Sequence, residues 1–197
     1  MGWPMAANIL KGGHDLAVFD LDRDAAARFV AEVGGRAAGG VAEVADAEVV
    51  VTMLPTSKHV RRALVDGEDG AFLKAVRPGL IVIDMSSSDA RRTLALGPKV
   101  AERQIDFADA PVSGGVAKAG SGELTAIVGA EEDLLARIEP LLKAMAANVF
   151  RVGTLGSGHA AKALNNLLSA TGLLISIEAV EAGKRFGIDP ETLLDLL

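Results

Sequence analysis

Short apolar runs alternate with amphipathic segments from the start of the chain through residue 152. Glu48–Thr52 contains three consecutive valines and Leu80–Met85 is a second apolar run, a pattern typical of strands buried on both faces of a parallel sheet. Asp24–Val33 and Asp89–Arg103 carry apolar residues at helical spacing instead. Further helices are predicted at Met5–Lys11, Val41–Ala45, Ser57–Val65 and Glu131–Met145, and further strands at Leu16–Phe19, Arg36–Ala38, Phe107–Ala110, Glu123–Val128 and Asn148–Val152.

This alternation of strands and helices predicts an α/β fold with a doubly wound, Rossmann-like parallel sheet. Ligands of such sheets bind at the carboxyl ends of the strands. Asp20, Pro55, Ser86–Ser88 and Pro111–Gly115 all follow predicted strands. The topology therefore predicts that these four positions converge on one edge of the sheet.

The longest helical pattern, from His159 to about Arg185, follows a turn with three glycines between residues 153 and 158. So many glycines in a short stretch predict a turn or a close approach of the backbone to another element. Lys162 and Asn166 stand four residues apart, so they share one face of the helix. An ammonium and a carboxamide on that face can hold the hydroxyl and carboxylate of a small polar molecule. The alternative is a solvated lysine near asparagines at a helix start.

The composition narrows the class of function. Half of the 197 residues are hydrophobic and only 4% are aromatic, which suits closely packed layers of helix on sheet. The net charge of −6 argues against nucleic acid or an anionic membrane as a standing partner. Without cysteine the chain has no disulfide, thiolate zinc site or cysteine nucleophile. Its three histidines are far apart in sequence, so no metal site is expected.

Targeting signals are not expected either. Met1–Leu10 lacks the basic start and apolar core of a secretory signal. Leu164–Ala182 is apolar but is interrupted by polar residues such as Asn165 and Glu178, which suits a buried core helix better than a membrane span. We therefore expect a soluble, cytoplasmic protein.

Both ends of the chain suggest a larger protein. A doubly wound nucleotide domain begins with a strand and Gly-x-Gly-x-x-Gly, of which Gly2 matches only the last glycine. In the strand order 3-2-1-4-5-6 that strand is central, so its absence leaves two neighbouring edges unpaired. At the other end, a helix that starts at Asp189-Pro190 stops at Leu197. The expected division is an N-terminally truncated nucleotide-binding domain over 1–155 and the truncated start of a helical domain over 156–197; the resemblance described below implies that this second domain serves dimerisation and substrate binding.

Several short motifs occur in a fixed order. They are Met1-Gly2-Trp-Pro4-Met5, Val18-Phe-Asp20, Met53-Leu-Pro55, Asp84-Met-Ser-Ser87, Asp109-Ala-Pro-Val-Ser113-Gly-Gly115 and Gly156-Ser-Gly158-His-Ala-Ala-Lys162-Ala-Leu-Asn-Asn166. In this order the chain resembles the β-hydroxyacid dehydrogenase family over essentially its whole length. The resemblance implies a nucleotide domain followed by a long interdomain helix that begins an all-α C-terminal domain. It also implies an NAD(P)-dependent oxidation of a small 3-hydroxy acid of the 3-hydroxyisobutyrate type.

The resemblance also implies the residues that handle the substrate. Lys162 matches the family's catalytic lysine, which exchanges a proton with the substrate hydroxyl and needs a desolvated cleft to lower its pKa. Asn166 matches a substrate-binding amide, and Ser113, Gly114 and Gly115 match the loop that receives the substrate carboxylate. The bland alternatives are a surface lysine, a helix-packing asparagine and an ordinary turn after a strand.

For the cofactor, the resemblance assigns Gly2, Asp20, Leu54, Pro55 and Ser87. A carboxylate at the end of the second strand accepts the ribose hydroxyls and repels a 2′-phosphate, so NAD is favoured over NADP. Asp20 is alternatively a helix cap. Leu54-Pro55 and Ser87 are alternatively a strand terminator and a helix N-cap.

Three functions remain open. The first is an NAD-dependent 3-hydroxyacid dehydrogenase with Lys162 as general acid/base, acting as a homodimer or homotetramer when complete. The second is a catalytically silent NAD-binding or dimerisation module, or an inactive fragment. The third is a decarboxylating dehydrogenase of the 6-phosphogluconate type, although no basic cluster for a substrate phosphate is evident.

Overall fold

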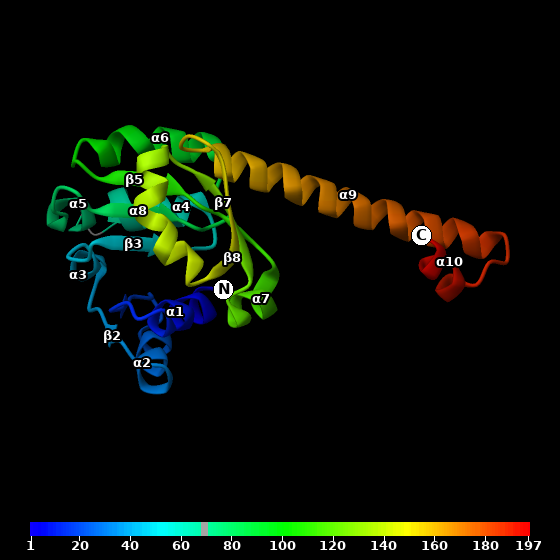
Figure 1. Ribbon diagram of the computed structural model, residues 1–197, viewed down its shortest axis with the longest axis horizontal. Coiled ribbons are helices and arrows are strands. Elements are labelled where there is room, and N and C mark those ends of the chain that lie inside the picture. The colour runs from blue at the N-terminus through cyan, green and yellow to red at the C-terminus, as the bar shows by residue number, and fades with distance from the viewer. Residues whose placement is uncertain (68–70) are drawn as a thin grey trace. The chain divides into compact units, whose positions relative to one another are not determined.

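The computed structural model describes residues 1–67 and 71–197 and confirms the predicted Rossmann-like architecture (Figure 1). The chain divides into two units, Met1–Lys162 and Ala163–Leu197. The first contains the sheet and the helices that cover it. The second contains most of the long helix and the last helix.

Most predicted elements appear within a few residues of their expected positions. The strands are β1 Ala17–Val18, β2 Arg36–Ala37, β3 Val49–Thr52, β4 Ile81–Asp84, β5 Asp106–Asp109, β6 Val112–Ser113, β7 Leu124–Gly129 and β8 Ala146–Gly153. The helices are α1 Gly2–Lys11, α2 Arg23–Glu32, α3 Val41–Val44, α4 Ser57–Arg61, α5 Ala71–Ala75, α6 Ala90–Ala101, α7 Gly115–Ser121, α8 Glu132–Lys143, α9 Ser157–Arg185 and α10 Pro190–Leu196. A π-helical segment, Arg62–Asp66, continues α4.

The parallel part of the main sheet consists of β3, β4 and β5. Beyond it the sheet becomes mixed, since β7 pairs antiparallel with β5 and β6 and parallel with β8. The reason lies in the connection: after β5 the chain runs on into β6, and α7 then turns it back. The left-handed backbone of Gly122 (φ +76°) ends α7 and leads into β7.

The two N-terminal strands form a separate parallel pair. β1 pairs with β2, and the main sheet has the order β3-β4-β5-β7-β6 with β8 on β7. The strand expected between β1 and β3 is not among the described strands.

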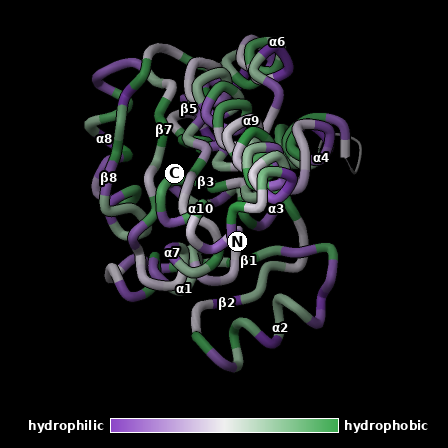
Figure 2. Tube along the Cα trace, turned by 90° about the vertical axis from the view of Figure 1, so that its right-hand side faces the viewer, coloured by the Kyte–Doolittle hydropathy of each residue, from purple (hydrophilic) through white to green (hydrophobic). Residues whose placement is uncertain are grey.

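Helices cover both faces of the main sheet, as a doubly wound fold requires. Ile81 and Ile83 of β4 pack into one core cluster with residues of α1 and α8. Val82, between them, packs into a second cluster with residues of α4 and α6. This alternation follows from the two-residue period of a strand. In Figure 2 the colour changes repeatedly between green and purple along α2 and α8, as expected for helices with one buried face.

The expectation that Leu164–Ala182 forms a buried core helix is wrong within the second unit, to which these residues belong. Leu167, Leu168 and Leu174 are all more than half exposed. The part of α9 after Lys162 has α10 as its neighbour, and α10 seats Leu193 against Gly183. The Asp189 side chain accepts the Thr192 N–H at 2.9 Å and so caps α10, as predicted. By length and hydropathy α9 is the one helix in the described chain that is able to cross a membrane, but length and composition alone are weak evidence.

Candidate functional site

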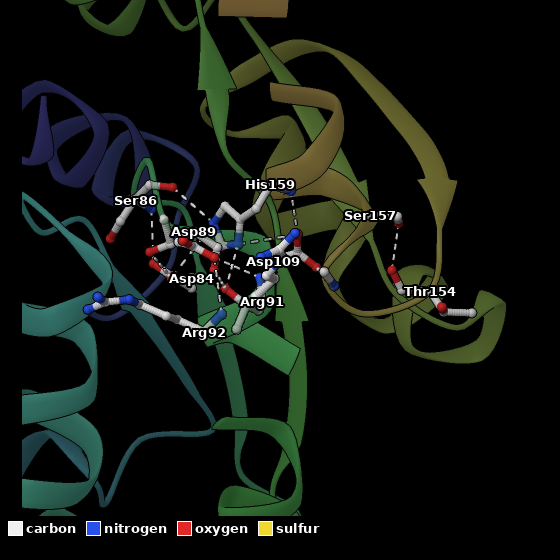
Figure 3. A network of polar contacts seen from close by, with 12 residues as sticks. Asp84, Ser86, Asp89, Arg91, Arg92, Asp109, Thr154, Ser157 and His159 are labelled. Atoms are coloured by element: carbon white, nitrogen blue, oxygen red, sulfur yellow. Dashed lines mark hydrogen bonds and ion pairs between the residues drawn. The ribbon is translucent and has the colours of Figure 1, made fainter. Parts of the chain in front are cut away.

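A buried polar cluster lies where β3, β4 and β5 end, at the edge of the sheet where the sequence predicted a site (Figure 3). Asp84, the last residue of β4, is almost fully buried. One of its oxygens accepts the Thr52 hydroxyl at 2.9 Å and the Ser86 N–H at 3.0 Å, and the other accepts the Ser88 hydroxyl at 2.8 Å. The Ser86 hydroxyl in turn accepts the Leu54 N–H at 2.9 Å. The loops after β3 and β4 are therefore fixed to each other.

Asp109 ends β5 and is completely buried. Its two oxygens accept main-chain N–H groups from the start of α9, Gly156 at 2.6 Å and His159 at 2.6 Å. Burial raises the pKa of the Asp109 carboxyl, and these N–H bonds act in the opposite direction because they favour the ionised form.

His159 joins the Asp84 and Asp109 parts of the cluster. Its Nε2 lies 3.0 Å from the Ser86 carbonyl oxygen, and because a carbonyl only accepts, Nε2 carries a proton. Its Nδ1 lies 2.9 Å from the Thr93 hydroxyl. Nε2 also lies 3.7 Å from an Asp84 oxygen, and Nδ1 lies 3.4 Å from an Asp109 oxygen. Both ring nitrogens of His159 therefore have partners within the cluster.

The glycine-rich turn before α9 behaves as predicted. Gly153 and Gly156 have φ of +150° and +87°, a region of backbone conformation that favours glycine. Gly158 is buried and approaches the backbone of Ile127.

Lys162 emerges from this fixed helix start and is half-buried. It follows His159 by three positions on α9, so the two residues are neighbours on the helix surface. Burial lowers the pKa of the Lys162 ammonium below its ordinary value. A lysine with a lowered pKa can exchange protons near neutral pH more readily than a solvated one.

On the cofactor side, Pro55 and Ser87 are exposed, and Leu54 and Gly2 are half-buried. They lie at the ends of β3 and β4 and at the start of α1. The N-cap role considered for Ser87 belongs to Asp89, whose carboxylate accepts the N–H groups of the first turn of α6.

Asp20 follows β1 and is exposed. One of its oxygens accepts the Asp22 N–H at 2.9 Å. Asp22, not Asp20, caps α2, because its side chain accepts the N–H groups of Asp24 and Ala25. The bland alternative for Asp20, a helix cap, is therefore excluded.

The predicted anion loop spans the end of β6 and the start of α7, because Ser113 ends the strand and Gly115 begins the helix. Ser113 is half-buried, and Gly114 and Gly115 are exposed, with φ of +129° and +71°. These positive φ angles are disfavoured for residues with a side chain. The side chain of Lys118 packs against Gly114, where it occupies the space that a Cβ would need. Asn166 lies one turn beyond Lys162 on α9, in the second unit.

The structure therefore joins the loops after β3, β4 and β5 to the start of α9 through hydrogen bonds. The sequence reasoning missed the buried residues that make this connection, above all Asp84, Asp109 and His159. The available signal was an aspartate directly after an apolar strand in Ile81–Asp84 and in Asp106–Asp109. Such an aspartate is buried only if other groups satisfy its oxygens.

Comparison with known families agrees with this architecture. Residues 1–153 match the family described as the NAD binding domain of 6-phosphogluconate dehydrogenase. Residues 156–197 match the family described as NAD-binding of NADP-dependent 3-hydroxyisobutyrate dehydrogenase.

Individual proteins that resemble the chain agree with these family matches. The chain is 40% identical over 198 residues to mitochondrial 3-hydroxyisobutyrate dehydrogenase of Bos taurus, covering 100% of this chain and 58% of that protein. It is 36% identical to NAD-dependent L-serine dehydrogenase of Pseudomonas aeruginosa, covering 100% and 65%. The solved structure of Mycobacterium tuberculosis 3-hydroxyisobutyrate dehydrogenase with L-serine has a TM-score of 0.91 at 35% identity, covering 100% of this chain and 66% of that one.

The chain thus spans about three-fifths to two-thirds of the length of these relatives. A family match over residues 1–153 covers well over half of the chain, and the relatives agree with it across both matched segments. By sequence and by fold, the chain belongs to the β-hydroxyacid dehydrogenase family.

Proposed function

We propose that the protein is an NAD-dependent oxidoreductase that interconverts a small 3-hydroxy acid and its carbonyl product, with Lys162 as the general acid/base. The observation that carries the proposal is the setting of Lys162. It is a half-buried amine with a lowered pKa, held at the start of α9 by the buried cluster at the carboxyl edge of the sheet. Ligands of doubly wound sheets bind at this edge.

In the oxidation, the free amine of Lys162 takes the proton of the substrate hydroxyl. In the reduction, the ammonium returns it. Desolvation favours the neutral amine, so a larger fraction of Lys162 is available as a base at neutral pH than for a solvated lysine. NAD, when bound, supplies the acceptor for the hydride that leaves the carbinol carbon.

The residues of the chain fit a dinucleotide. The first N–H groups of α1 have no acceptor within the helix, and no side chain caps them among the described residues. Gly2 keeps the space in front of them open, since only the Met53 Cβ comes within 4 Å of the position of an added Cβ, at 3.9 Å. Such a helix start can receive a pyrophosphate. Asp20 would accept the adenosine ribose hydroxyls, which favours NAD over NADP.

Leu54, Pro55 and Ser87 would line the remainder of the cofactor site. Their accessibility supports this assignment, because they stand above a layer that is itself buried. The hydrogen bond between the Leu54 N–H and Ser86 holds the two loops together.

The substrate carboxylate would bind at Ser113, Gly114 and Gly115. An exposed backbone with φ of +129° and +71° at successive glycines can turn N–H groups toward an anion. Asn166 would bind the substrate from α9. Two of the relatives act, by name, on 3-hydroxyisobutyrate and L-serine, and both compounds carry a hydroxyl on the carbon β to a carboxylate. This supports the 3-hydroxy acid class.

For the organisation of the whole protein we propose a nucleotide domain over 1–155 and a helical domain that starts at 156. Exposed apolar side chains on α9, such as Leu167, Leu168 and Leu174, support a homo-oligomer in which further protein covers them. The net charge of −6 suits a protein that works in the cytoplasm without a nucleic acid or membrane partner.

The test is a survey of substrates with the intact protein. NADH or NADPH formation is followed with 3-hydroxyisobutyrate, L-serine, a 2-hydroxy acid and 6-phosphogluconate. The proposal expects turnover with 3-hydroxy acids and NAD. Turnover with 6-phosphogluconate alone would favour the decarboxylating class instead, and tight NADH binding without turnover of any hydroxy acid would favour a silent binding module.

A further inference from the structure

The α9 helix that carries Lys162 is anchored through its first turn. The first N–H groups of any helix lack acceptors within the helix. In α9 an acceptor comes from a different element, because Asp109 of β5 receives the N–H of His159 in the first turn and also that of Gly156 directly before the helix, 50 and 47 residues further along the chain. Asp109 thus caps α9 from the end of a central strand.

Two glycines let the start of the helix approach the sheet closely around the Asp109 carboxylate. A Cβ added at Gly158 would lie 2.4 Å from the Ile127 carbonyl oxygen and 2.8 Å from Asp109 Oδ2. A Cβ added at Gly129 of β7 would lie 2.3 Å from Asp109 Oδ1 and 2.8 Å from the Gly158 nitrogen. The start of α9 therefore packs directly against β5 and β7, and these close approaches fix its position on the sheet.

A second anchor sets the rotation of the same turn. The His159 ring is held by the Ser86 carbonyl at 3.0 Å and the Thr93 hydroxyl at 2.9 Å. Ser86 belongs to the loop that also carries Ser87. The helix is thus tied both to the end of β5 and to the loop after β4, and Lys162 follows three residues later.

We infer that Asp109 is a positioning residue for proton transfer, which fixes the first turn of α9 and thereby the place of the Lys162 amine at the carboxyl edge of the sheet. This inference rests on the proposed function of Lys162. A displacement of about 1 Å in a reacting group can cost about a hundredfold in rate. A cap with two bonds of 2.6 Å restricts such movement.

Asp109→Asn is the most direct variant. The amide keeps the size of the side chain but turns an N–H₂ group toward one of the two N–H donors, so one bond is replaced by a repulsion. Asp106→Asn is the matched control. Asp106 lies on the same strand, and its partner Arg137 is an exposed side chain on α8.

Three measurements on the intact protein separate positioning from simple stabilisation. They are kcat at saturating 3-hydroxy acid and NAD, the NADH dissociation constant from quenching of Trp3 fluorescence, and the pH midpoint for acetylation of Lys162 read by mass spectrometry. For Asp109→Asn we expect kcat to fall by at least about tenfold and the acetylation midpoint to rise toward that of an ordinary lysine. We expect NADH binding to change by less than about twofold, and Asp106→Asn to change none of the three by more than that.

Loss of thermal stability in Asp109→Asn with kcat and the acetylation midpoint unchanged would overturn the inference. If Asp109→Asn does not fold, Asp109→Ser, which removes the carboxylate without placing an N–H₂ group against the two donors, is measured in the same way and judged by the same criteria. If the wild-type protein turns over no hydroxy acid, the proposed function fails. The acetylation midpoint then still decides whether Asp109 fixes the place of the Lys162 amine, because it reports the surroundings of Lys162 without turnover.

Discussion

The main-chain N–H of His159 donates to the buried carboxylate of Asp109 across a distance of 2.6 Å. This bond joins the first turn of α9 to the end of β5, at the edge where doubly wound sheets bind their ligands. The residues predicted to meet ligands around this edge are half-buried or exposed, whereas the polar residues beneath them are buried. The candidate site therefore consists of accessible residues above a layer of buried, hydrogen-bonded residues.

The seat of α9 leads to a prediction about packing. Gly158→Ala places a methyl group 2.4 Å from the Ile127 carbonyl oxygen, and a backbone atom cannot rotate away. We expect a loss of about 1–3 kcal/mol in the free energy of unfolding, measured by urea denaturation of the intact protein. Gly120→Ala is the control, because Gly120 is also a helical glycine and has open space around the new methyl; alanine should leave stability unchanged or raise it. Equal stability of the two variants would show that the close approach is not real.

A second stability prediction concerns α1 and α7. The buried Asn8 amide donates to the Ala119 carbonyl at 2.7 Å and so connects α1, which starts at Gly2, to α7, which starts at Gly115. Asn8→Ala leaves that buried carbonyl without its donor, which should cost about 1–3 kcal/mol. Thermal denaturation checks this against Asn148→Ala, a change at an exposed position. If both variants melt together with the wild type, the bond contributes nothing.

Burial lowers the pKa of Lys162, and this gives the pH dependence of turnover a definite sign. Oxidation needs the neutral amine, so its rate should rise with pH and level off above the Lys162 pKa, at a pH below that of an ordinary lysine. Reduction needs the ammonium, so its rate should fall through the same pKa. Single-turnover rates in both directions measure this without interference from product release. A profile that is flat in both directions would contradict the role of Lys162.

Cofactor choice is predicted to depend on Asp20. Asp20→Asn keeps an oxygen for the Asp22 N–H but removes the charge that repels a 2′-phosphate. NADH binding should weaken by about tenfold, as expected for a lost hydrogen bond to a charged group, and the preference for NADH over NADPH should narrow. Trp3, the single tryptophan, lies in the first turn of α1, and the quenching of its fluorescence reports both affinities. Asp15→Asn, also exposed, is the control, and an unchanged preference in Asp20→Asn would remove Asp20 from the site.

Much of the fold could be predicted because it depends on local patterns. Buried parallel strands such as Ile81–Asp84 are mostly apolar, and helix starts such as Asp189-Pro190 have characteristic residues. The direction of β7 was missed, because an apolar run has the same composition whichever way it runs. α7 was missed because Gly115–Ser121 is short and contains two glycines, which lowers its helix propensity.

The accessible residues of the candidate site are predictions from motifs, whereas the buried residues beneath them were not predicted. Ser87 and Lys162 belong to recognisable stretches, whereas Asp109 and His159 act through a contact between residues 50 positions apart. The order of residues along one chain does not by itself indicate which distant residues are in contact. His159 was considered only as a metal ligand, and its bonds to Ser86 and Thr93 depend on the tertiary structure.

The central claim, that Lys162 transfers the proton, is tested most directly by Lys162→Met in the intact protein. Single-turnover oxidation of the preferred 3-hydroxy acid is measured beside NADH binding by Trp3 fluorescence. A positioned acid/base contributes about 10²–10⁴-fold, so the account predicts a loss of that size with NADH affinity nearly unchanged. Turnover within about tenfold of the wild type would contradict it.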